Sequence, residues 1–217
     1  MSLSLAPSRP VLADRVLPAA LRLSKGRSLA TDAALVVGGA ALTAALAQLY
    51  IPMWPIPMTG QTFAVLLVGT VLGSLRGSLS MALYLVAGVL GAPVFAEHTS
   101  GSLFALTSGG FIIGFIAAAA LVGWLAQREW DRRVVGTVVS FAAGTVVMYA
   151  FGLPWLAVSL GDLGPAVWHD FLHFDSLGAA VWGAGVAPFL VGDVVKAVVA
   201  GLLLPAAWKG VSHLRSR

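Results

Sequence analysis

An aspartate and a lysine stand three residues apart within an otherwise apolar stretch near the C-terminus. Asp193 and Lys196 lie in the run from Ala187 to Trp208, which is long and apolar enough to cross a membrane as a helix. Residues three apart share one face of a helix. A charge at bilayer depth costs roughly 2.5–3.5 kcal/mol, so such charges face a protein interior or a polar cavity. We therefore expect this face to line a small-molecule site; the alternative is a neutralised structural pair between helices.

The composition of the chain indicates an integral membrane protein. Of its 217 residues 59% are hydrophobic and only 10% are charged, against roughly 25% charged residues in soluble domains. At about 20 residues per span, this length allows about five to seven helices in one domain and leaves no room for a separate soluble catalytic domain. The chain has no cysteine, which excludes disulfides, thiolate metal sites and cysteine nucleophiles.

The pattern of apolar runs predicts an all-α membrane protein with six transmembrane helices. Their expected ranges are 33–49, 61–75, 77–91, 109–127, 134–153 and 187–208. Thr31 or Asp32 is expected to be the N-cap of the first helix, and residues 154–184 are expected to form a loop. The six-helix domain, residues 33–208, is flanked by an N-terminal arm, residues 1–32, and by a basic tail, residues 209–217.

The basic residues predict the orientation of these helices in the membrane. Every Lys and Arg except Lys196 lies in the N-terminal arm, in the tail, or in the turns after the second and fourth helices. By the positive-inside rule both termini and these turns are cytoplasmic, so the net charge of +4 reflects topology and not nucleic-acid binding. Asp193 then lies in the outer-to-middle part of the last helix, and its cavity opens outward, which suits capture of a solute for import.

The segment 50–60 contains three prolines within six positions, which exclude a helix there. Because the segment is apolar and uncharged, we expect it to fold over the helices as a lid. Trp54 and Met58 are candidates for apolar contact with a ring-shaped ligand, or they anchor the segment in the membrane interface. Thr59 is expected to cap the next helix, with Gln61 in its first turn.

Small residues recur at every fourth position of the first helix, and such rows let helix backbones approach closely in lipid. The two rows consist of Ala40, Ala44 and of Ala41, Ala45. They serve either to pack the first helix within its own bundle or to dock another membrane subunit.

Catalytic and metal-binding patterns are missing. The chain has no GxxxxGK[ST], GxSxG or HExxH pattern, so phosphate-loop ATP hydrolysis, serine hydrolysis and zinc hydrolysis have no signal. His169 and His173 have i,i+4 spacing but stand among acidic residues of an expected loop. We expect no enzymatic activity, no metal site and no cofactor. What remains is a pocket with one carboxylate, one ammonium and apolar walls, suited to a small ligand that presents N–H donors to Asp193.

Five segments together resemble those of a known family. They are Pro55–Thr62, Leu72–Gly77, Gly91–Ala96, Gly109–Phe115 and Pro188–Lys196. In this order the chain resembles the BioY family, the biotin-specific substrate-binding (S) components of energy-coupling-factor (ECF) transporters, over most of residues 33–208. The chain departs from the usual family pattern at Thr107-Ser108 and at Val191, where the family often has proline.

The resemblance implies high-affinity capture of biotin from outside and its uptake across the bacterial cytoplasmic membrane. It also implies docking of the first helix onto a membrane coupling subunit that carries two ATPase subunits. The ureido N–H groups of biotin suit Asp193, whereas the end of biotin that Lys196 meets stays open. The candidate binding residues are Asp193, Lys196, Tyr84, Trp54, Met58, Thr59, Gln61 and Tyr149. Two alternatives remain: a solitary or homo-oligomeric proton-coupled biotin transporter, and an S component for another vitamin.

Overall fold

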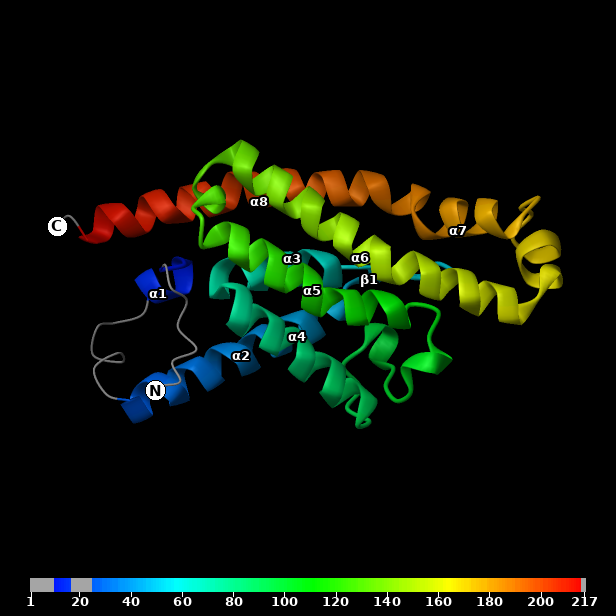
Figure 1. The fold of residues 1–217 in the computed structure, drawn as a ribbon, viewed down its shortest axis with the longest axis horizontal. Helices are drawn as coiled ribbons and strands as arrows, with labels where there is room; N and C mark the ends of the chain where they lie inside the picture. Colours follow the sequence, from blue (N-terminus) through cyan, green and yellow to red (C-terminus); the bar gives the residue numbers. More distant parts are fainter. Residues whose placement is uncertain (1–9, 17–24, 216–217) are drawn as a thin grey trace.

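Long apolar segments without a polar face form most of this protein. They fold into a bundle of helices with a short hairpin (Figure 1). The computed structural model describes residues 10–16 and 25–215. The hairpin pairs β1 (Tyr50–Ile51) with β2 (Met58–Thr59) in antiparallel fashion. The helices are α1 (Leu12–Val16), α2 (Lys25–Ala47), α3 (Gln61–Leu72), α4 (Ser74–Val89), α5 (Gly109–Ala126), α6 (Val134–Leu163), α7 (Leu177–Gly185) and α8 (Ala187–Arg215).

Four helical segments of the described chain are long and apolar enough to cross a membrane. They are Leu29–Ala47, Gly109–Ala126, Val134–Leu163 and Leu177–His213. The two remaining apolar helices, α3 and α4, have 12 and 16 residues. The expectation of an all-α membrane protein is confirmed by these segments.

Helix α5 lies at the centre of the bundle and packs against α3, α4 and α6, while α8 lies along α6 (Figure 1). Helices α3 and α4 meet at a tight turn, where Gly73 has a φ of +87°. A Cβ on Gly77 would lie 2.7 Å from the Cα of Gly69. Only glycine permits this separation, so the two short helices pack backbone to backbone beside α5.

The first membrane helix begins earlier than expected. Asp32 is not an N-cap, because α2 already starts at Lys25. Its carboxylate Oδ1 lies 2.7 Å from Nη2 of Arg76, whose Nη1 lies 2.7 Å from Oδ1 of Asp14 in α1. The Arg76 side chain is buried. The N-cap prediction was wrong because Asp32 lies within the helix. Its carboxylate forms an ion pair with a distant residue, Arg76, and does not cap the local backbone.

The loop expected over residues 154–184 is largely helical. Helix α6 continues through Pro154 to Leu163, and α7 follows. A proline within a helix removes one backbone hydrogen bond, and packing of the apolar residues beyond it compensates here. Leu156 and Leu160 are fully buried against Ile56 and Ala180. The prediction of a loop was wrong because this tertiary packing outweighs the local effect of Pro154.

A buried carboxylate ties the turn between α5 and α6 to the last helix. Asp131 belongs to the 3-10 turn η4 (Trp130–Arg132), and its Oδ2 accepts a hydrogen bond of 2.6 Å from Nε1 of Trp208. Its other oxygen, Oδ1, is buried without a partner among the described residues. Burial raises the pKa of Asp131 to about 6, against an ordinary value of 3.8, although the hydrogen bond from Trp208 acts in the opposite direction.

This raised pKa predicts a pH-dependent stability. Between about pH 4 and pH 6 the folded protein keeps the Asp131 proton while the unfolded chain loses it, so stability falls as the pH rises, by on the order of 3 kcal/mol for a shift of about two pKa units. Asp131→Asn should flatten this decline, which thermal unfolding of both proteins in detergent from pH 4.5 to 7 would measure. Equal pH slopes in the two proteins would contradict it.

Candidate functional site

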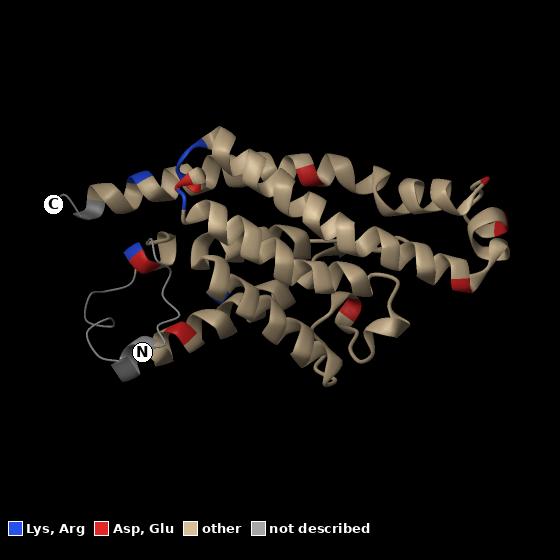
Figure 2. Ribbon diagram, in the orientation of Figure 1, with Lys and Arg blue, Asp and Glu red and all other residues tan. Residues whose placement is uncertain are grey.

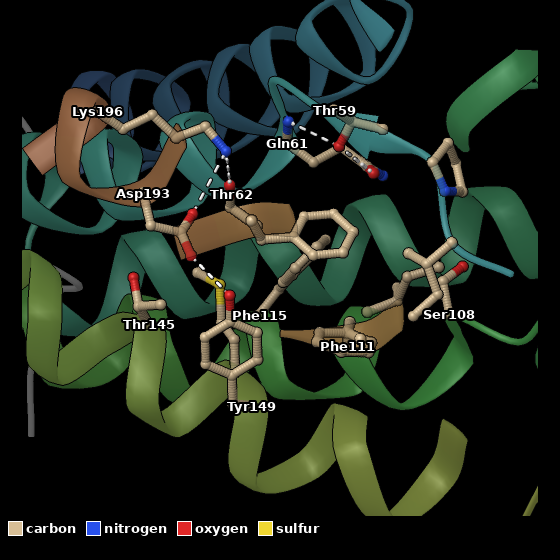
Figure 3. Close-up of a pocket in the computed structure, with 16 residues that line it drawn as sticks. Thr59, Gln61, Thr62, Ser108, Phe111, Phe115, Thr145, Tyr149, Asp193 and Lys196 are labelled. Atoms are coloured by element: carbon tan, nitrogen blue, oxygen red, sulfur yellow. Dashed lines mark hydrogen bonds and ion pairs between the residues drawn. The ribbon is translucent and has the colours of Figure 1, made fainter. Parts of the chain in front are cut away.

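A hollow lies between α3, α5, α6 and α8 on the inner side of the proline-rich segment (Figure 3). It encloses about 550 Å³ of space free of atoms, including space open to the outside. Its lining surface is mostly apolar, although eight of the sixteen lining residues have polar or charged side chains. The lining residues are Ile56, Pro57, Thr59, Gln61, Thr62, Ser108, Phe111, Ile112, Phe115, Thr145, Met148, Tyr149, Gly185, Phe189, Asp193 and Lys196.

The aspartate and the lysine of α8 share one face and both line this hollow. Lys196 Nζ lies 3.5 Å from Oδ1 of Asp193 and donates a hydrogen bond of 2.7 Å to Oγ1 of Thr62. Oδ2 of Asp193 accepts a hydrogen bond of 2.7 Å from the hydroxyl of Tyr149. The two charged side chains are only 14% and 19% exposed. Three helices thus hold one carboxylate in a fixed orientation at the wall of the hollow (Figure 3).

A second polar group stands at the start of α3. Gln61 donates through Nε2 to the hydroxyl of Tyr84 at 2.5 Å, and its Oε1 accepts from Oγ1 of Thr59 at 2.8 Å. Thr59 Oγ1 also accepts from the Gln61 backbone at 3.2 Å, although the N-cap residue is Gly60. Tyr84 does not line the hollow. It is buried behind Gln61 and fixes the orientation of that amide.

The walls of the hollow contain residues that the sequence analysis missed. Phe111, Phe115 and Met148 supply apolar surface from α5 and α6, and the ring of Phe111 meets that of Tyr149 edge to face at 6.1 Å between centroids. The missed polar residues are Thr62, Ser108 and Thr145. A signal existed for two of them: Thr62 directly follows Gln61, and Thr145 stands one helical turn before Tyr149.

The proline-rich segment does fold back against the helices, but only part of it borders the hollow. Ile56 and Pro57 line it, and the backbone oxygen of Pro55 accepts a hydrogen bond from Oγ1 of Thr107. Trp54 lies outside, 45% exposed, with its ring 5.5 Å from that of Phe171. Met58 is also not among the lining residues. The structure therefore brings together five of the eight expected residues, which are Thr59, Gln61, Tyr149, Asp193 and Lys196.

The two alanine rows of α2 face different surroundings. Ala40 is buried inside the bundle, as is Thr43 on the same side of the helix. Ala41 and Ala45 are exposed, and the space next to Gly38 is open, since a Cβ there would meet no atom within 4 Å. Ala40 therefore packs within its own chain and Ala44 is half-buried against the same core, whereas the row of Ala41 and Ala45 is exposed and open to a partner.

Within the described residues no group of three His, Asp or Glu side chains is arranged to hold a metal ion. His169 lies in the π-helical turn η5 (Ala166–Phe171), where its Nδ1 is 2.7 Å from Oδ1 of Asp170. Both side chains are largely exposed. The polar side chains that meet inside the helix bundle are those of the hollow, and this arrangement suits binding of a small solute.

Comparison with known proteins agrees with this description. The BioY family matches residues 18–213. The "Biotin transporter BioY" of Rhizobium etli is 34% identical over 171 residues, 75% of this chain and 83% of that protein. The "Probable biotin transporter BioY" of Pyrococcus horikoshii is 35% identical over 175 residues, 80% of this chain and 94% of that protein.

A solved structure shares the fold. The crystal structure of "the S-component for biotin from an ECF-type ABC transporter" superimposes with a TM-score of 0.54 at 21% sequence identity, covering 87% of this chain and 93% of that one. The fold thus agrees with the sequence relationship, and the sequence comparisons give the family. The chain belongs to the BioY family.

Proposed function

We propose that this protein binds biotin in the hollow between α3, α5, α6 and α8 and takes it up across the membrane as the S component of an ECF transporter. The observation that carries the proposal is the largely buried pair of Asp193 and Lys196, held by Tyr149 and Thr62 in a hollow whose walls also include apolar side chains such as Phe111 and Phe115. The relatives named biotin transporters support the choice of ligand.

The chemistry of biotin fits this arrangement. Its ureido N–H groups are donors, and the Asp193 carboxylate is an acceptor with lone pairs beyond those used by Tyr149. Its sulfur-containing ring is apolar and suits the wall formed by Phe111 and Phe115. Lys196 already donates to Thr62 and faces Asp193. Its role in the proposal is therefore to compensate the negative charge of Asp193 at the wall of the hollow.

The proposed topology has six crossings with both termini in the cytoplasm of a bacterial cell. In it α3 and α4 are short spans, and α7 and α8 form the last crossing. Ribbon segments of Lys and Arg gather at the end of the bundle that holds α1, the α5–α6 turn and the C-terminal part of α8, while the far end shows only acidic segments (Figure 2). This polarity supports the positive-inside orientation, and the basic end would be cytoplasmic.

The exposed row of α2 is the proposed contact with a membrane coupling subunit, which would carry two ATPase subunits. Replacing a small residue in such a row prevents close approach of helix backbones. Ala41→Leu should leave biotin binding by the isolated protein unchanged and lower ATP-dependent uptake by about tenfold or more. The control variant Leu42→Ala changes the neighbouring exposed position and should change neither biotin binding nor ATP-dependent uptake. Full uptake by Ala41→Leu would place the contact elsewhere.

Equilibrium binding of biotin to the purified protein in detergent tests the function itself. We expect saturable binding at one site per chain, without competition by thiamine or riboflavin. No binding by a well-folded protein would overturn the ligand, and competition by another vitamin would identify a different one. Uptake that persists in cells without any ECF ATPase would instead favour a solitary, proton-coupled transporter.

A further inference from the structure

A second hollow lies at the turn between α5 and α6, far along the bundle from the lid segment. It encloses about 1,020 Å³ of space, its open mouth included, and is lined chiefly by the segment 128–136. The start of α6 packs closely here, because a Cβ on Gly136 would lie 2.2 Å from the backbone oxygen of Trp130. The wall is therefore built by the packing of η4 on α6.

Three arginines line this hollow, and two of them have no carboxylate partner in the described part of the chain. Within the described residues Arg128 and Arg133 form no ion pair, while Arg132 lies 3.0 Å from Oε1 of Glu129. The remaining acidic group of the turn, Asp131, is buried and directed at Trp208. The hollow thus presents two uncompensated guanidinium groups, which favours an anion with oxygens that accept several hydrogen bonds.

Neighbouring groups place this hollow at the boundary of the hydrocarbon layer. The guanidinium of Arg128 lies over the ring of Trp124, 3.5 Å from its centroid, and exposed tryptophans at helix ends are typical of the membrane interface. Val135, which lines the hollow, is 74% exposed at the start of the spanning helix α6, and Val139 one turn further is also exposed. An apolar strip therefore leads from the arginines into the membrane-facing surface.

We propose that this hollow binds the headgroup of an anionic phospholipid, with the phosphate between Arg128 and Arg133 and an acyl chain along Val135 and Val139. Basic pockets beside spanning helices on the cytoplasmic side are known to suit such headgroups. The apolar strip distinguishes a lipid from a free phosphate, which would gain nothing from exposed valines. The proposal does not depend on the identity of the transported solute.

Native mass spectrometry of the full chain in detergent, with phosphatidylglycerol and phosphatidylcholine of identical acyl chains, tests the proposal. We expect higher occupancy of phosphatidylglycerol, reduced about fivefold by Arg133→Gln and further by Arg128→Gln together with Arg133→Gln. Lys209→Gln removes the same charge from an exposed position of α8 and is the matched control. Unchanged thermal unfolding of Arg133→Gln, whose side chain has no described partner, shows that the fold is intact.

Three results would overturn the proposal. Equal occupancy by the two lipids would show that the headgroup charge is not recognised. An equal loss in Lys209→Gln would show a general effect of net charge at this end of the protein. Displacement of phosphatidylglycerol by millimolar inorganic phosphate would show a site for small anions without a contribution from the acyl chain.

Discussion

Asp193→Asn should weaken biotin binding by about 100-fold or more, because Asp193 is the only carboxylate among the described residues that line the hollow. Hydrogen bonds to a charged group are worth about 1.5–3 kcal/mol each, and a factor of ten corresponds to about 1.4 kcal/mol. An asparagine at this position would keep the hydrogen bond from Tyr149 only by turning its oxygen toward that hydroxyl. Its amide N–H groups would then face the donors of the ligand.

Equilibrium binding of biotin to the purified variant measures this effect, and two variants make it specific. Tyr149→Phe keeps the carboxylate and removes one hydrogen bond, so we expect a smaller loss, about five- to tenfold. Asp162→Asn removes the same charge at an exposed position near the end of α6 and should bind as tightly as the wild type. Wild-type affinity in Asp193→Asn would exclude Asp193 as the acceptor and leave it a structural partner of Lys196.

Lys196→Met should lower both thermal stability and biotin affinity, since it leaves Asp193 as a buried carboxylate without a cation. Both side chains of the pair are more than four-fifths buried, and breaking such a pair from one side costs about 3–5 kcal/mol. Methionine preserves most of the length of the lysine side chain, so the loss of the charge dominates the result. Thermal unfolding and biotin binding of the same preparation measure the two effects.

The double variant Asp193→Asn with Lys196→Met separates stability from recognition. With both charges gone, neither of these two positions holds an uncompensated charge, so stability should recover to within about 1 kcal/mol of the wild type. Biotin binding should stay as weak as in Asp193→Asn alone. If binding recovered together with stability, the pair would be structural, and ligand recognition would rest on other residues of the hollow.

The family and the charged centre of the hollow were predictable from the sequence because each leaves an unusual signal. A carboxylate and an ammonium in an apolar run are energetically costly in a membrane, so Asp193 and Lys196 stand out without any structure. The spacing of three also predicts their common face, and α8 places both in the hollow. Gln61 and Tyr149 were likewise polar residues in or beside apolar segments.

The remainder of the wall was set by tertiary structure alone. Phe111, Phe115 and Thr145 are ordinary residues of membrane helices, and composition does not distinguish a helix face toward a cavity from one toward lipid, since both are apolar. Only the packing of α5 and α8 against α6 directs them inward. Trp54 shows the converse: its size made it a candidate, yet the lid places it outside against Phe171.

The sequence by itself determined the class of protein, the family and the charged pair. In a bilayer, charged residues are costly and a crossing helix needs a minimum apolar length, and both features can be identified directly in the sequence. The tertiary structure decided which alanine row of α2 is buried, how far α6 continues beyond Pro154, and which uncharged side chains surround Asp193. These outcomes depend on contacts between segments far apart in the chain. Such contacts cannot be inferred from the hydropathy or the spacing of neighbouring residues.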